Sequence, residues 1–174
     1  MPNPPKKKGF SLQGFDAQSY KQTEAYVQAI DALYNQAVQE FANVASKVNL
    51  DSSKPFSFKD YPQAKKKADE IISGLSNKIK TVIVSGSRNQ WLYACKKNDD
   101  FLDYILNTSK VNPKTLAKYQ DKNLDALAAF QNRKVDGLSL SDRIWNYTGQ
   151  MKTQMELGID IALGDGRSAN ALSR

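Results

Sequence analysis

The sequence predicts an all-α fold, an elongated bundle of long helices that follows a flexible basic N-terminal arm. Residues 16–48 contain no proline or glycine, and apolar side chains recur along them at intervals of three and four. The same spacing returns in later segments, and no pair of segments shows the pattern of two partner strands. Hydrophobic residues make up 40% of the 174-residue chain, an ordinary share for a globular protein. We therefore expect helices to form the whole core.

The first fifteen residues, 1–15, are predicted to be the flexible arm. Three prolines among the first five residues disfavour a helix, and lysines at positions 6–8 add solvated positive charge. We expect the bundle of long helices to occupy residues 16–136. Residues 137–174 are expected to form a helix-turn-helix segment that continues beyond the given chain.

The first long helix is predicted over residues 16–48, with a length of about 50 Å. Tyr26 and Leu33 widen its apolar stripe beyond the seam of a two-stranded coiled coil, so packing within a bundle is favoured. In the loop that follows, Phe56 and Phe58 are expected to hold the chain against the bundle. The stripe is formed by two positions, three residues apart, in each repeat of seven residues: Tyr20, Thr23, Val27, Ile30, Tyr34, Ala37, Phe41, Val44 and Val48.

The second helical region is predicted over residues 60–107, with Asp60 as its cap and Pro62 in its first turn. The glycine within Ser85–Ser87 is expected to kink this helix, and the Asn-Asp-Asp sequence at 98–100 to break it. Its apolar face is expected to contain Ala64, Ala68, Ile71, Leu75, Ile79 and Val82.

The third helix is predicted over residues 113–134 and the fourth over residues 142–163. We expect Ser141 to cap the fourth helix, and Leu140 and Trp145 to pack together as a hydrophobic staple across its start. The inner stripe of the fourth helix is expected to contain Ile144, Thr148, Met151, Met155, Ile159 and Ala162.

The chain has no histidine and one cysteine, which excludes imidazole-based catalysis and an internal disulfide. We expect Cys95 to pack in the core. No catalytic residue, cofactor site or metal site is predicted, and the chain is not expected to be an enzyme on its own. The longest aliphatic run, Val82–Val84, is far too short to span a membrane, so no membrane contact is expected.

Two acidic side chains lie one turn apart on the predicted fourth helix. Glu156 and Asp160 have a spacing at which two carboxylates can share a divalent ion. No second acidic helix with histidine ligands accompanies them, so a solvent-facing acidic patch is the favoured interpretation. The nearby segment Gly164–Ser168 resembles a phosphate-binding loop only superficially, because a helix precedes it where a strand is required.

The net charge of +7 is unevenly distributed. Residues 59–97 carry nine bases and three acids, whereas residues 135–165 carry two bases and five acids. This asymmetry suits a polyanion in one region and a protein partner in the other, although solvated helix faces are the favoured interpretation. Possible contacts with DNA would be non-specific. The lysines that can make them lie at the start of the second helix and in a ridge of about 12 Å along the third: Lys65, Lys66, Lys67, Lys114, Lys118 and Lys122.

Two motifs near the end of the chain stand at a characteristic spacing. A Leu-Ser-Asp-Arg-Ile-Trp segment begins at Leu140, and a Gly-Asp-Gly-Arg-Ser turn begins at Gly164. With a helix between them, they resemble the motif of phage minor head proteins, the head morphogenesis proteins of the phage Mu protein F-like family. Helix energetics do not explain Arg143, which is expected to bind an acidic partner or a helix C-terminus. The matching residues are Leu140, Ser141, Arg143, Ile144, Trp145, Gly164, Gly166 and Ser168.

The resemblance implies a structural component of a phage or prophage virion, located at the portal vertex of the head and made in the bacterial host cytoplasm. Its implied partners are portal and/or capsid proteins, and its implied role is to assist head assembly and DNA packaging or delivery. Two alternatives stay open. One is a basic helical nucleic-acid-binding protein without a virion role. The other is the non-catalytic N-terminal part of an enzyme whose active domain lies beyond Arg174. A homo-oligomer is possible in each case.

Overall fold

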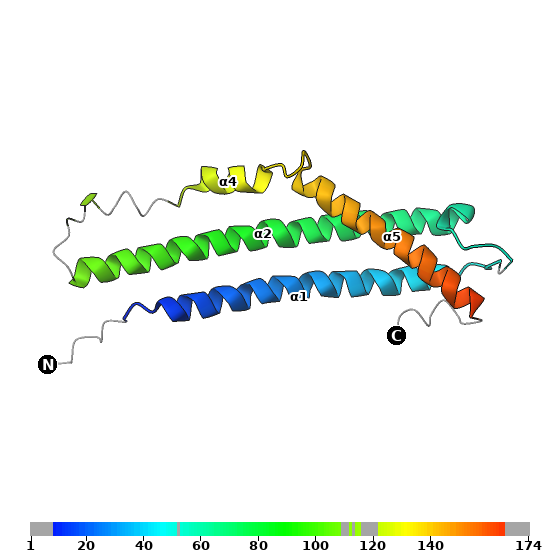
Figure 1. The fold of residues 1–174 in the computed structure, drawn as a ribbon, viewed down its shortest axis with the longest axis horizontal. Helices are drawn as coiled ribbons and strands as arrows, with labels where there is room; N and C mark the ends of the chain where they lie inside the picture. Colours follow the sequence, from blue (N-terminus) through cyan, green and yellow to red (C-terminus); the bar gives the residue numbers. More distant parts are fainter. Residues whose placement is uncertain (1–8, 52, 109–111, 113, 116–121, 166–174) are drawn as a thin grey trace. The chain divides into compact units, whose positions relative to one another are not determined.

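The structure is a computed structural model that describes residues 9–51, 53–108, 112, 114–115 and 122–165. Within these ranges it contains four α-helices, one 3-10 helix and no strand apart from an isolated bridge between Val135 and Leu138 (Figure 1). The predicted all-α fold is confirmed. The elements in chain order are α1 (Leu12–Ala45), η1 (Phe58–Asp60), α2 (Pro62–Thr108), α4 (Leu124–Asn132) and α5 (Leu140–Gly164).

The chain forms two compact units that interleave along the sequence. Unit 1 combines the residues up to Tyr26 with Ser85–Gln131, and unit 2 combines Val27–Val84 with the residues from Asn132 onward. The helices α1 and α2 contribute to both units, and α5 belongs to unit 2. No helix in the described ranges has both the length and the apolar character that crossing a membrane requires.

Helix α1 begins at Leu12, four residues before the expected start at Asp16. The hydroxyl of Ser11 accepts a hydrogen bond from the main-chain N–H of Gly14 (3.1 Å), which satisfies one of the free amides of the first turn. This local cap explains the earlier start. The first eight residues of the expected arm lie outside the described residues.

In unit 1, α1 meets α2 through the rings of Phe15 and Tyr26 and through polar contacts, and not through the expected heptad positions. Ser19 donates a hydrogen bond to the side chain of Gln90 (2.8 Å), which in turn donates to Gln22 (3.1 Å). Tyr20, a member of the expected stripe, is 73% exposed. The heptad prediction therefore fails in this half of α1, where a different face of the helix meets α2. In unit 2 the stripe does reach the core, where Phe41 is fully buried.

Helix α2 is continuous over 47 residues, so the expected break at residues 98–100 is wrong. An ion pair between Lys96 and Asp100, one turn apart at 2.7 Å, spans the sequence that was expected to end the helix. Gly86 lies against the ring of Tyr26, whose atoms are 3.1 Å from the position that a Cβ at residue 86 would take. The glycine thus allows close approach of the two helices. Pro62 is the first residue of α2, in agreement with its expected place in the first turn.

Unit 2 contains the main core, in which α5 packs against α1 and α2. The ring of Phe58 contacts the rings of Phe41 (5.6 Å between centroids) and Phe56 (4.9 Å). The prediction that Phe56 and Phe58 hold the loop against the bundle is confirmed, since both are buried. Ile72 is fully buried on α2, whereas Ile71 is only partly buried. The predicted inner stripe of the fourth helix is confirmed, and its buried members are Ile144, Thr148, Met151, Met155, Ile159 and Ala162.

The third helix is shorter than predicted. Helix α4 begins only at Leu124, and Lys122 and Asn123 before it are not helical. Asn123 has a φ of +43°, a conformation that asparagine tolerates better than most residues. Its side-chain oxygen accepts a hydrogen bond from the main-chain N–H of Ala126 (3.1 Å) and so caps α4. The prediction of one continuous helix over residues 113–134 is therefore wrong.

Candidate functional site

Helix α5 carries most of the residues that the sequence singled out, and its start is fixed by a capping box. Ser139 accepts a hydrogen bond from the main-chain N–H of Asp142 (3.2 Å), and the carboxylate of Asp142 accepts one from the main-chain N–H of Ser139 (2.9 Å). The hydroxyl of Ser139 also donates a hydrogen bond to the Asp142 carboxylate (2.7 Å), and this bond, followed by the bond from the Ser139 amide, lowers the pKa of the Asp142 carboxyl. The predicted cap at Ser141 is wrong by two residues. The reciprocal bonds require an acid three residues after the cap, and only Ser139 has one.

The shifted cap changes the roles of the family-motif residues at this end of α5. Leu140 becomes the first helical residue and packs partly buried against the core, and Ile144 is buried. Because Leu140 lies within α5 and not before its cap, the predicted staple with Trp145 is wrong, and Trp145 is 53% exposed. Gly164 ends α5, as predicted, while Gly166 and Ser168 lie outside the described residues.

Arg143 is the motif residue whose side chain has a buried nitrogen that the described contacts do not account for. Its side chain is half-buried, and its Nε is buried without a hydrogen-bond partner among the described residues. A buried donor without an acceptor is costly, and in native proteins it calls for an explanation such as a partner or an ordered water. The expectation that Arg143 binds an acidic partner stays a prediction.

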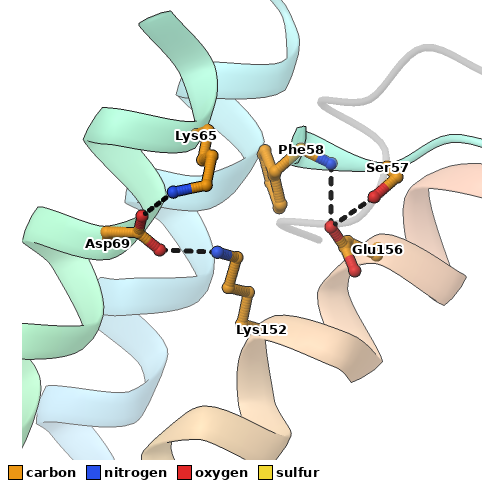
Figure 2. A network of polar contacts seen from close by, with 6 residues as sticks. All are labelled: Ser57, Phe58, Lys65, Asp69, Lys152 and Glu156. Atoms are coloured by element: carbon orange, nitrogen blue, oxygen red, sulfur yellow. Dashed lines mark hydrogen bonds and ion pairs between the residues drawn. The ribbon is translucent and has the colours of Figure 1, made fainter. Parts of the chain in front are cut away.

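Glu156 and Asp160 do not form a solvent-facing acidic patch, so that interpretation is wrong. One carboxylate oxygen of Glu156 accepts hydrogen bonds from the main-chain N–H of Phe58 (2.8 Å) and from the hydroxyl of Ser57 (3.0 Å) (Figure 2). Asp160 accepts a hydrogen bond from the main-chain N–H of Phe56 (2.8 Å). The two acids therefore hold the loop between α1 and α2 against α5.

A second set of charged contacts joins α5 to α2. The carboxylate of Asp69 accepts hydrogen bonds from Lys152 on α5 (2.5 Å) and from Lys65 one turn earlier on α2 (2.9 Å) (Figure 2). These bonds, the one from Lys152 first, lower the pKa of the Asp69 carboxyl. All three side chains are partly exposed, so we expect a modest contribution to stability.

The described lysines proposed as nucleic-acid contacts are divided between the two units, with Lys65, Lys66 and Lys67 in unit 2 and Lys114 and Lys122 in unit 1. Lys67 pairs with Glu70 at 2.7 Å, and Lys66 is exposed beside them. Lys122 lies outside the helices, where its main-chain carbonyl accepts a hydrogen bond from the indole of Trp91 (2.7 Å). The predicted ridge from Lys114 through Lys118 to Lys122 requires a continuous helix that is not present, and Lys118 lies outside the described residues. Contact with nucleic acid stays a prediction.

Cys95 is half-buried rather than enclosed in the core. Its sulfur lies 3.8 Å from the main-chain carbonyl of Lys122. Within the described residues, no group of three or more acidic or cysteine side chains is arranged to hold a metal ion. The polar groups brought together by α5 bind main-chain amides and other side chains of the same unit, and their arrangement is that of a structural junction.

Sequence reasoning missed the bonds from α5 to the loop at Phe56–Phe58. The available signal was the loop itself, because buried main-chain N–H groups outside helices need acceptors. Two acids one turn apart on the adjacent helix can supply them, but the pairing of loop and helix depends on the tertiary fold. Comparisons with protein-family models, with curated proteins and with solved structures find no match to this chain.

Proposed function

We propose that this chain is a structural component of a phage or prophage head and acts through protein contacts made by the start of α5. The observation that carries the proposal is the pair Arg143 and Trp145. Trp145 presents a half-exposed indole, and Arg143 lacks an acceptor for its buried Nε within the described residues. Tryptophan and arginine are the side chains most enriched among the residues that dominate protein interfaces.

The setting of these two residues supports a role in binding. The capping box between Ser139 and Asp142 fixes the first turn of α5, and Ile144 between them is buried in the core. The two side chains therefore stand on a rigid helix, which lowers the entropic cost of binding. The partner that the resemblance suggests is the portal or a capsid protein, and Arg143 favours a site on it with a carboxylate or the carbonyls of a helix end.

The proposal is tested by measuring binding of the purified chain to the portal protein of the phage or prophage that encodes it. We expect Trp145→Ala to weaken this binding at least about 30-fold, the loss typical of a dominant interface residue. The matched control is Tyr20→Ala, which removes another exposed aromatic side chain from a helix. Absence of binding by the wild-type chain, together with absence of the chain from virions, would contradict the proposal.

A further inference from the structure

The outer face of α5 differs from every other helical surface that the structure describes. Of the residues from Trp145 to Gly164, every one that is exposed is uncharged. These exposed residues are Trp145, Asn146, Tyr147, Gln150, Thr153, Gln154, Leu157, Ile161 and Gly164. By contrast, the exposed surfaces of α1, α2 and α4 all include charged residues such as Asp16, Lys66 and Asp125.

The charged residues in this part of α5 are held at its inner side. Lys152 pairs with Asp69, while Glu156 and Asp160 accept hydrogen bonds from the loop of unit 2. A solvent-facing helix usually carries charges of both signs, which keep it soluble. The uncharged outer face of α5 therefore points to an interface.

Part of this face has the spacing of a helix–helix seam. Tyr147, Gln150, Gln154, Leu157 and Ile161 follow one another at intervals of three, four, three and four residues. This 3-4 spacing places them on one stripe about 20 Å long, as in the seam of a coiled coil. The apolar side chains on it are far from buried, with Tyr147 65%, Leu157 60% and Ile161 56% exposed.

We propose that this stripe binds the same stripe of a second copy of the chain, so that two α5 helices pack together in a homodimer. The absence of charge from the stripe fits this partner. Two copies with a net charge of +7 each repel one another, and a two-fold contact brings the same patch of both copies together, so that charges of one sign on it would face each other. An uncharged stripe is a surface on which such copies can approach without opposing like charges.

The polar residues of the stripe fit the same partner. Gln154 stands near its middle, with Tyr147 seven residues before it and Ile161 seven residues after it. A glutamine amide both donates and accepts hydrogen bonds, so it can pair with an identical amide across a two-fold axis. Tyr147, Leu157 and Ile161 supply the apolar contacts on either side. Trp145 is not on this stripe, and the inference does not depend on the proposed phage role.

The mass of the full-length chain in solution tests the inference, by light scattering and by sedimentation equilibrium over about 1–500 µM. We expect a monomer–dimer equilibrium in the micromolar range, because one helical stripe is smaller than a standard interface. The dimer should tighten as salt is raised, since salt screens the repulsion between two positively charged copies. A monomer throughout this range of concentration overturns the proposal.

Single substitutions locate the interface. We expect Leu157→Lys to raise the dimer dissociation constant at least tenfold, because it places two like charges across the axis. The control Gln28→Lys adds the same charge at an exposed position of α1 and should leave the constant nearly unchanged. A dimer that Leu157→Lys leaves unchanged overturns the proposal. The proposal is also overturned if the wild-type chain is a monomer and Leu157→Lys abolishes its binding to the portal, since the stripe then binds a different partner.

Crosslinking tests the same geometry without destabilising the contact. In a Cys95→Ser background, Gln154→Cys should form a covalent dimer with a short bismaleimide reagent, because position 154 lies close to its own counterpart. Gln28→Cys in the same background should react with the reagent without forming a dimer. Equal yields of covalent dimer from the two variants would count against the proposed stripe.

Discussion

The carboxylate of Glu156 accepts a hydrogen bond from the main-chain N–H of Phe58, a residue 98 positions earlier in the chain. The same oxygen accepts the hydroxyl of Ser57, and Asp160 one turn later accepts the N–H of Phe56. Phe56 and Phe58 are both buried, so the loop that carries them has main-chain amides away from water. The two acids of α5 satisfy these amides while the rings fill the core, which couples polar and apolar contacts at one junction.

Glu156→Ala is expected to destabilise the chain by about 1–3 kcal/mol, the cost of leaving partly buried donors without their charged acceptor. Urea unfolding monitored by circular dichroism measures the change. Glu156→Gln retains an acceptor oxygen and should lose less. Gln28→Ala, at an exposed position of α1, is the control for the effect of an alanine on a helix surface. If Glu156→Ala were no more destabilising than this control, the junction would not be stabilised by these bonds.

Asp142 makes the stability of the start of α5 depend on pH. Its pKa is lowered from the ordinary value of 3.8 by the hydrogen bonds from Ser139. A carboxyl with a lower pKa in the folded state stabilises that state above its unfolded pKa, and this contribution disappears as pH falls through the folded pKa. We therefore expect the stability of the wild type to fall more steeply than that of Asp142→Asn as the pH drops from 5 to below 3.8. Urea midpoints measured across this range provide the test, and parallel curves for the two proteins would contradict it.

Two glycines of α2 are expected to respond oppositely to alanine. At Gly86 an added methyl group would lie 3.1 Å from the base of the Tyr26 ring, which cannot swing aside freely because the Tyr26 hydroxyl is bonded to Asn89. At Gly74, apart from its two neighbours and the surrounding backbone of α2, no atom of the described chain lies within 4 Å of that position. Gly74→Ala should stabilise the chain by up to about 1 kcal/mol through helix propensity. Gly86→Ala should be destabilising, and equal stabilisation by both variants would show that α1 and α2 do not approach closely at Tyr26.

The sequence predicted those elements in which apolar spacing and burial agree. The stripe of α5 from Ile144 to Ala162 and the anchoring role of Phe56 and Phe58 follow from local patterns, because the core selects the same face. Where other contacts determine which face of a helix meets its neighbour, apolar spacing alone does not predict that face. In unit 1 the contact of Phe15 with Tyr93 and the bond of Ser19 to Gln90 lie off the heptad positions, and no local signal specifies these pairings.

The candidate site was predictable to a similar degree. The motif residues Arg143 and Trp145 were singled out from the sequence, but the exposure of Trp145 was not expected, because the cap was placed at Ser141. Both Ser139 and Ser141 are acceptable cap residues, and the choice between them depends on Asp142 reaching back to an amide. The role of Glu156 required knowledge of which loop lies beside α5, and this is a property of the tertiary fold.

Asn123 tests why the third helix is shorter than its periodicity suggested. Its positive φ interrupts the helical backbone, and its side chain caps α4 through the N–H of Ala126. Asn123→Ala removes the cap and adds strain at a positive φ, so we expect a loss of about 1–2 kcal/mol in the free energy of unfolding. Asn123→Gly removes the cap but tolerates the positive φ, and it should lose less. If Asn123→Ala instead stabilised the chain and raised its helical circular dichroism signal, residues 122 and 123 would be helical in solution, and the ridge through Lys114 and Lys122 would regain its geometric basis.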